Sequence, residues 1–171
     1  MTGWALARCR LGVGVTLALL LTACAPPTND GVETVTINGE TFELELSADD
    51  ASRAQGLMGR DHIPADGGML FVFPDAQVRS FWMANCITDI DLMFLDPRGR
   101  VTAVHRMKTL PPRRADETVA AYEARCSAAG SGSVYPAQFA IELAPGSLDR
   151  LGIGVEDRIE LDLDRLKALA R

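Results

Sequence analysis

Hydrophobic and polar residues alternate on both sides of the dipeptide Asn38-Gly39. Apolar side chains stand at positions 35 and 37 before it and at positions 42, 44 and 46 after it. A period of two is typical of a strand with one buried face, and Asn-Gly is the strongest short signal for a tight hairpin turn. The pattern therefore predicts a β-hairpin over residues 32–46.

The period then changes to that of a helix. Ala51, Ala54, Leu57 and Met58 recur at helical spacing, and an aspartate at position 49 or 50 can cap the first turn. Glycines at positions 56 and 59 are typical of a helix end. The segment predicts one short helix over residues 51–58.

Short apolar segments make up most of the remaining chain. They predict strands at 69–73, 79–84, 92–95, 101–107, 139–143 and 158–163, and a terminal helical turn at 163–169. Residues 108–138 are rich in Pro, Arg, Ala, Gly and Ser, and they predict a long loop. The whole pattern predicts a mostly β (α+β) fold, in which an antiparallel sheet curls into a small barrel or sandwich with one short helix.

The N-terminal residues have the pattern of a targeting segment. Arg8 and Arg10 precede an apolar stretch at 11–21, which is shorter than the ~20 residues that span a bilayer and fits a signal peptide. The tetrad Leu-Thr-Ala-Cys at 21–24 is similar to a bacterial lipobox and predicts a lipid on Cys24, with an uncleaved anchor as the alternative. We expect a lipoprotein signal peptide at 1–23, a tether at 24–32 and one globular domain at 33–171.

The predicted lipid anchor indicates where the protein is located, and its net charge limits the kinds of partner it can bind. A diacylglycerol on Cys24 would hold the exported protein on the periplasmic face of the cell envelope. By analogy with known lipoproteins, Ala25 rather than Asp after the cysteine favours the outer membrane where the cell has one. Removing residues 1–23 takes away two of 17 basic residues and no acidic ones, which leaves 15 against 23, a net charge of −8. Nucleic-acid-binding proteins carry a basic patch, so the charge argues against a nucleic-acid partner.

The predicted processing leaves two cysteines in the folded domain. Cys9 leaves with the signal peptide and Cys24 carries the lipid, so Cys86 and Cys126 remain. An even pair in an exported protein is more often a disulfide than two free thiols, and the C-x-x-C spacing of most redox pairs is absent. We predict a structural Cys86–Cys126 disulfide.

A dense block of specific residue types lies between positions 56 and 96. It contains Gly-Leu-Met-Gly-Arg from position 56, Gly-Met-Leu-Phe-Val-Phe from 68, Ser-Phe-Trp-Met-Ala-Asn-Cys from 80 and Ile-Asp-Leu-Met-Phe-Leu-Asp from 90. With looser matches at 141–143, 146, 152–153 and 157, the stretch 42–161 resembles the bacterial and archaeal family called domain of unknown function 192. Ala84, Cys86 and Asp89 depart from the family pattern, which has Lys, Thr and Pro there. The resemblance implies a shared fold but no particular reaction.

Four residues of this block are candidate ligand-binding residues: Arg60, Trp82, Asn85 and Asp91. Side chains alternate across a strand, so Trp82 faces away from Phe81 and either forms a ligand platform beside Asn85 or is covered by the helix or the loop. Arg60 either forms a buried ion pair with Asp91, hydrogen-bonds loop carbonyls, or recognises an anionic ligand with help from Asn85.

Two further patterns suggest chemistry of other kinds. Asp89 and Asp91 are two residues apart, so an extended segment would place both carboxylates on one face for acid–base work. Met58, Met69, Met83, Met93 and Met107, with His62 and His105, offer soft ligands for copper(I), although their spacing is that of core residues. Nucleophile elbows and phosphate-binding glycine loops are absent from the sequence.

The sequence therefore favours a lipid-anchored envelope protein without enzymatic activity. It would bind a small molecule or an envelope protein through Arg60, Trp82 and Asn85 or through the 108–138 loop, and we expect no cofactor and no metal. The alternative is an envelope hydrolase that uses Asp91 with Arg60 or a histidine, and copper(I) handling is a lesser one. An enzyme predicts that Arg60, Asn85 and Asp91 converge on an open cleft, with a carboxylate of perturbed pKa.

Overall fold

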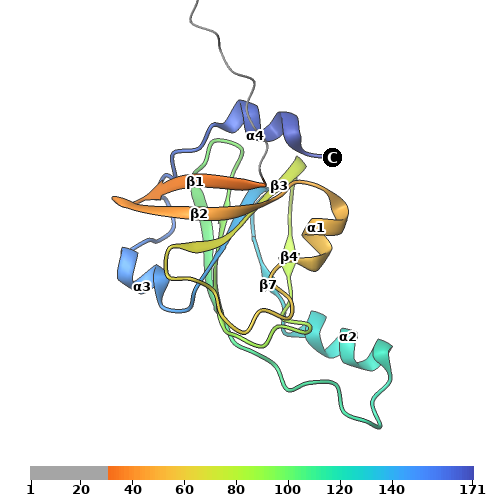
Figure 1. Cartoon of the computed structure of the whole chain (residues 1–171). Helices are drawn as coiled ribbons and strands as arrows, with labels where there is room; N and C mark the ends of the chain where they lie inside the picture. The colour runs from red at the N-terminus through yellow and green to blue at the C-terminus, as the bar shows by residue number, and fades with distance from the viewer. Residues whose placement is uncertain (1–30) are drawn as a thin grey trace, which may run out of the picture.

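The computed structural model describes residues 31–171, so the predicted signal peptide, the predicted lipidation site Cys24 and most of the tether lie outside the described residues. The chain forms a six-stranded sheet in the order β1-β2-β3-β8-β5-β6 and a two-stranded sheet of β4 and β7 (Figure 1). The strands are β1 (Val32–Ile37), β2 (Glu40–Ser47), β3 (Gly67–Gln77), β4 (Ser80–Phe81), β5 (Ile90–Leu95), β6 (Val101–Met107), β7 (Ser131–Gly132) and β8 (Ala137–Leu143).

The N-terminal hairpin forms as the sequence predicts. Asn38 has φ 47° and Gly39 has φ 87°, and two successive positive φ angles are what a tight hairpin turn requires. The following helix α1 (Asp50–Gln55) begins in a capping box, in which the Asp49 carboxylate accepts from the Ser52 backbone N–H at 2.9 Å and the Ser52 hydroxyl accepts from the Asp49 N–H at 3.3 Å. This helix connects β2 to β3, which run parallel, whereas the other neighbouring strands pair antiparallel.

The main sheet curls but does not close. Its order runs from β1 to β6 without a pairing between these two edge strands, so the fold is sandwich-like rather than a barrel. The central strands β5 and β8 are buried along their full length. Because successive side chains of a strand point to opposite faces, each central strand contributes to two hydrophobic cores.

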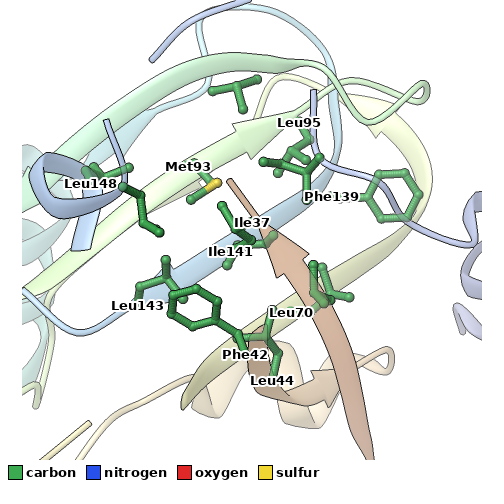
Figure 2. Packing of buried hydrophobic residues seen from close by; sticks show 14 of the residues in the cluster. Ile37, Phe42, Leu44, Leu70, Met93, Leu95, Phe139, Ile141, Leu143 and Leu148 are labelled. Carbon is green, nitrogen blue, oxygen red and sulfur yellow. The ribbon is translucent and has the colours of Figure 1, made fainter. Parts of the chain in front are cut away.

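The first core lies inside the curl of the sheet. Figure 2 shows Ile37, Phe42 and Leu44 of the hairpin gathered with side chains of β3, β5 and β8. Leu148 and Leu151 from α3 (Ser147–Leu151) and Leu166 from α4 (Leu163–Leu169) complete this core. The second core lies on the other face and contains Phe71, Leu92, Phe94, Ala140 and Met69 among others. Residue 142 follows the alternation of Ala140 and therefore faces the second core.

Three predicted segments differ from the structure. The expected strand 79–84 is paired only at Ser80–Phe81, because the chain turns at 83–86, where the Cys86 N–H donates to the Met83 carbonyl. The expected loop 108–138 contains α2 (Val119–Ala128), which begins at a Thr118 cap and buries Tyr122 and Cys126 one helical turn apart. The expected strand 158–163 has only an isolated bridge between Arg158 and Arg100, while the helical turn predicted after it is present as α4.

Within residues 31–171, no helix combines the length and the apolar character needed to cross a bilayer.

Candidate functional site

A cavity of about 410 Å³ opens between α1 and the segment 78–82 that carries β4. Its lining comes from α1 and the turn after it, from β3, from residues 78–82, and from Cys86 and Glu142. α1 and β4 lie close together at the same end of the molecule in Figure 1. Because the second core borders this space, the cavity has mainly apolar and aromatic walls.

Glu142 is the buried acidic residue in the lining of this cavity. The residue is only 4% exposed, and its Oε2 is buried with no hydrogen-bond partner within the described part of the chain. Burial disfavours the charged form and raises the pKa of Glu142 from its ordinary 4.5 to about 8. At neutral pH the carboxyl group is therefore protonated and can donate as well as accept a hydrogen bond.

The sequence positions Glu142 through strand alternation and a glycine. Glu142 pairs with Met69 on one side and Leu92 on the other, and all three point toward the second core. Gly56, with φ 49°, lies over the carboxyl group, and a Cβ there would be 3.9 Å from the Glu142 Oε2 and 3.5 Å from the Phe71 ring. The absence of a side chain at Gly56 thus leaves room in the cavity.

Aromatic rings form the walls. The Phe81 ring meets Phe71 edge-to-face with centroids 4.8 Å apart, and it meets Phe73 in the same way at 6.4 Å. Trp82 also lines the cavity and is 39% exposed. Such rings offer a ligand a large apolar surface of fixed shape.

Two arginines stand in the lining near Phe73. The guanidinium carbons of Arg79 and Arg53 lie 4.1 and 5.5 Å from the Phe73 ring centroid. Arg79 forms an ion pair with Asp75, and Arg53 forms one with Asp50 at 2.6 Å and donates to the Val72 carbonyl at 2.8 Å. The Arg79 Nε is buried and has no acceptor among residues 31–171.

A second cavity of about 380 Å³ adjoins the first. Met58 and Trp82 line both cavities, so these two side chains form the partition between them. The second cavity also receives Asn85, Tyr122 and other residues around α2. The Tyr122 hydroxyl accepts from the Asn85 backbone N–H at 2.8 Å and fixes this turn, where Asn85 has φ 55°.

Comparison with known proteins gives the family. Residues 33–161 match DUF192, whose description is "Uncharacterized ACR". The chain belongs to the DUF192 family. No curated protein matches the chain.

Two crystal structures are similar to this DUF192 domain. A "putative transcription regulator" from Sinorhizobium meliloti 1021 is 31% identical, with a TM-score of 0.57 over 75% of this chain and 90% of that one. A protein of unknown function from Novosphingobium aromaticivorans DSM 12444 is 26% identical, with a TM-score of 0.61 over 87% of this chain and 100% of that one. The family resemblance stated from the sequence is therefore confirmed.

The DUF192 fold brings together two of the four predicted ligand-binding residues. Trp82 and Asn85 both line the second cavity, and Trp82 reaches the first as well. Arg60 instead forms a half-exposed ion pair with Glu45 at 2.6 Å. The predicted Arg60–Asp91 ion pair is absent, because Glu45 lies on the neighbouring strand β2 and provides the closer carboxylate.

Asp91 has a structural contact of its own. It is buried, and its Oδ2 accepts from the Leu148 backbone N–H at 2.9 Å. The N-cap residue of α3 is Gly146, which has no side chain to cap the helix. Asp91, on strand β5, instead accepts from an N–H in the first turn of the helix. Asp89 binds elsewhere, to the Thr109 N–H and to Lys108, and these contacts lower the pKa of its carboxyl group.

The predicted disulfide is not formed in this structure. Cys86 and Cys126 are both buried free thiols, Cys86 in the second core and Cys126 against Tyr122 and Ala84. Burial, followed by the charge of Glu142, raises the pKa of Cys86 to about 11. This thiol is therefore a poor nucleophile at neutral pH.

The methionines and histidines are dispersed. Met69, Met83 and Met107 pack in the second core and Met93 in the first, while Met58 lines the cavities. The His105 Nε2 lies 2.8 Å from the Gly132 carbonyl oxygen, and His62 is exposed. Over the described residues, no three His, Cys, Asp or Glu side chains are grouped to hold a metal.

Sequence reasoning missed the central group of the cavity. Glu142 entered only as part of a loose family match, and Arg53 and Arg79 were not singled out. The available signal was an acidic residue within Phe-Ala-Ile-Glu-Leu, an otherwise apolar strand. The predicted convergence of Arg60, Asn85 and Asp91 is not found, but an open cleft with a carboxyl group of perturbed pKa exists around Glu142.

Proposed function

We propose that this protein is a lipid-anchored member of the cell envelope whose DUF192 domain binds a small ligand in the cavity above Glu142. One observation carries the proposal: the buried Oε2 of Glu142, which has no hydrogen-bond partner among residues 31–171, belongs to the lining of an aromatic-walled cavity of a size suited to a small molecule. Buried polar groups are normally paired, so a group that lacks a partner within the described chain indicates a partner from outside it.

Binding without catalysis is supported by the neighbours of Glu142. A nucleophile or base in the same cavity would be needed for most hydrolytic mechanisms, and the thiol of Cys86 is held protonated by its raised pKa. Asp91, the residue expected to act in a hydrolase, is bound to α3 instead. A transcription regulator is named among the similar structures, but that description belongs to that protein, and the acidic charge of this chain argues against nucleic acid.

The location is supported by the sequence alone. The apolar stretch at 11–21 and the lipobox-like Leu-Thr-Ala-Cys at 21–24 predict export and a lipid on Cys24. The first strand begins at residue 32, so a short tether would hold the domain close to the membrane surface.

The test is a fragment screen with a blocked cavity. Small aromatic fragments (cationic, neutral and anionic) are screened against the purified chain by ligand-observed NMR. Ala54 lies in the lining and Ala51 lies on the same helix outside it, and both are exposed, so Ala54→Trp blocks the cavity and Ala51→Trp is the matched control. Hits should disappear with Ala54→Trp and persist with Ala51→Trp. Hits that survive both substitutions, or a screen without hits, would contradict the proposal.

A second candidate is an enzyme that uses Glu142 as a general acid. A carboxyl group with a pKa of about 8 keeps its proton at neutral pH, as a general acid must. This candidate predicts turnover of 4-nitrophenyl esters, phosphates or glycosides that Glu142→Gln abolishes. Equal release of nitrophenol by the wild type and this variant would eliminate it.

A further inference from the structure

The unpartnered carboxyl group and the aromatic rings together define a class of ligand. We infer that the cavity binds an organic cation, an amine or amidine carried on a ring, whose N–H groups donate to Glu142 while the ring packs among Phe71, Phe81 and Trp82. The inference rests on the proposed function, since it specifies the ligand of the same cavity.

A positively charged donor is the best complement to Glu142. A charge-assisted hydrogen bond between a cationic N–H and a carboxylate is roughly twice as strong as a neutral one. The group is buried and its Oε2 is unsatisfied by residues 31–171, so an incoming N–H loses no existing hydrogen bond to that atom. A cationic donor would therefore gain more from this carboxyl group than a neutral ligand could.

The walls favour the same charge. Aromatic faces attract cations through their quadrupole, and the molecule already uses this attraction at Phe73, where the guanidinium group of Arg79 stacks 4.1 Å from the ring centroid. Phe73 is occupied in this way, which leaves Phe71, Phe81 and Trp82 to contact the ligand. The apolar walls also exclude water and strengthen an ion pair within the cavity.

The two arginines of the lining do not oppose a cation at Glu142. Each is paired with a carboxylate, Arg53 with Asp50 and Arg79 with Asp75, and only the Nε of Arg79 is left without an acceptor among residues 31–171. A guanidinium group close to Glu142 would lower its pKa, whereas burial is the one cause that acts on this residue. The net charge of −6 for the whole chain also attracts cations rather than anions.

Binding of a cation displaces a proton. The ligand arrives charged, the Glu142 O–H bond breaks, and the proton passes to the solvent, so the charges balance in the complex. The other titratable or charged groups on this side of the sheet include Cys86 and Cys126, and His105 in the strand next to Leu92. They also include Glu45 opposite Met69, with its partner Arg60, and the two paired arginines of the lining. Removal of the Glu142 carboxyl group separates its effect from theirs.

Three probes of almost equal shape test the charge: benzamidine (cationic), benzamide (neutral) and benzoate (anionic). Their Kd values are measured by NMR titration against the wild type, Glu142→Gln and the surface control Glu160→Gln, whose own side chain is largely exposed. Benzamidine should bind at least about tenfold more tightly than the other two, and Glu142→Gln should remove this preference while Glu160→Gln leaves it. Its Kd should fall about tenfold for each pH unit from 6 to 8 and then level off.

Other outcomes overturn the inference in distinct ways. Preference for benzamide would mean that Glu142 acts as a neutral donor, and preference for benzoate would mean that the arginines select the ligand. Either result contradicts the inference and retains the proposed small-ligand cavity. If none of the three probes binds, while other fragments bind the wild type and are lost with Ala54→Trp, the inference is likewise contradicted and the small-ligand cavity is retained. If Ala54→Trp abolishes the binding of no fragment at all, the proposed function fails as well.

Discussion

Replacing Glu142 by Gln should make the domain more stable at high pH and leave it almost unchanged at low pH. The substitution keeps the size and shape of the side chain and removes its ionisation. In the unfolded chain the carboxyl group ionises around its ordinary pKa of 4.5, whereas in the folded domain burial raises the pKa to about 8. Below pH 4.5 both states are protonated, and the wild-type residue costs no ionisation energy.

The magnitude follows from the difference between these two pKa values. Between pH 4.5 and about 8 the unfolded chain has lost the proton that the folded domain keeps, so the free energy of unfolding falls as pH rises. The slope is about 1.4 kcal/mol for each pH unit, and the total loss above pH 8 is about 5 kcal/mol. This is a large fraction of the roughly 5–15 kcal/mol that stabilises a typical domain.

The assay is urea denaturation followed by circular dichroism at intervals from pH 4 to pH 9. Wild type, Glu142→Gln and the exposed control Glu160→Gln are compared, and the difference from wild type cancels the titration of all other groups. The advantage of Glu142→Gln should grow from near zero at pH 4 to several kcal/mol at pH 9, while Glu160→Gln should show no such trend. A difference for Glu142→Gln that is constant with pH would refute a buried, protonated carboxyl group.

Three other predictions use simpler perturbations. Asp91→Ala leaves a buried N–H of α3 without its acceptor and should cost about 1–3 kcal/mol of unfolding free energy in urea, whereas Asp91→Asn retains an acceptor and should cost less; equal losses would contradict the capping role. Cys86 should react slowly with iodoacetamide in the native protein at pH 8 and rapidly in urea, because its pKa is raised to about 11; equal rates, or a thiol absent from both states, would contradict the buried free thiol. Cys24→Ser should move the protein from the membrane fraction to the soluble fraction, and unchanged sedimentation of the folded variant would argue against the lipid anchor.

The sequence predicted correctly those elements whose conformation depends on residues that are adjacent or nearly adjacent in the chain. The hairpin depends on positive φ at Asn38 and Gly39, which two adjacent residue types indicate clearly. The start of α1 depends on an aspartate and a serine three positions apart. The central strands were predicted because runs of apolar residues with few breaks are typical of strands buried on both faces.

Elements that depend on distant contacts were missed. Helix α2 buries only Tyr122 and Cys126, so its sequence carries few apolar residues at helical spacing and predicts a loop. Residues 158–163 have strand-like composition, but their only pairing within the described chain is the bridge between Arg158 and Arg100, and Ile159 and Leu161 pack against the first core. The sequence did not predict the parallel pairing of β2 with β3 either, because this pairing depends on the path of the chain through α1.

The candidate site was predicted only in part, because most of its residues come together through distant contacts. Trp82 and Asn85 were identified because aromatic and amide side chains in a specific block stand out locally. The partner of Arg60 could not be chosen from the sequence, because many carboxylates were available and only the fold brings Glu45 beside it. Glu142 required knowledge of which face of β8 borders a cavity.

Comparison of the buried acids separates structure from function within this one domain. Among residues 31–171 the buried acidic side chains are Asp91, Glu117 and Glu142. Asp91 accepts from the N–H of Leu148, and the pKa of Glu117 is lowered to about 2, first through its hydrogen bonds from Arg125. Both therefore stabilise the fold through partners that the chain provides.

Glu142 has no such partner for its Oε2, and its raised pKa makes it destabilising at neutral pH, where Gln or Leu would fit the same strand at lower cost. Groups that reduce stability are expected where activity or binding needs them. A structural role would require a stabilising contact that the described residues do not supply. The proposed ligand would supply the missing partner, since Glu142 lines a cavity with aromatic walls.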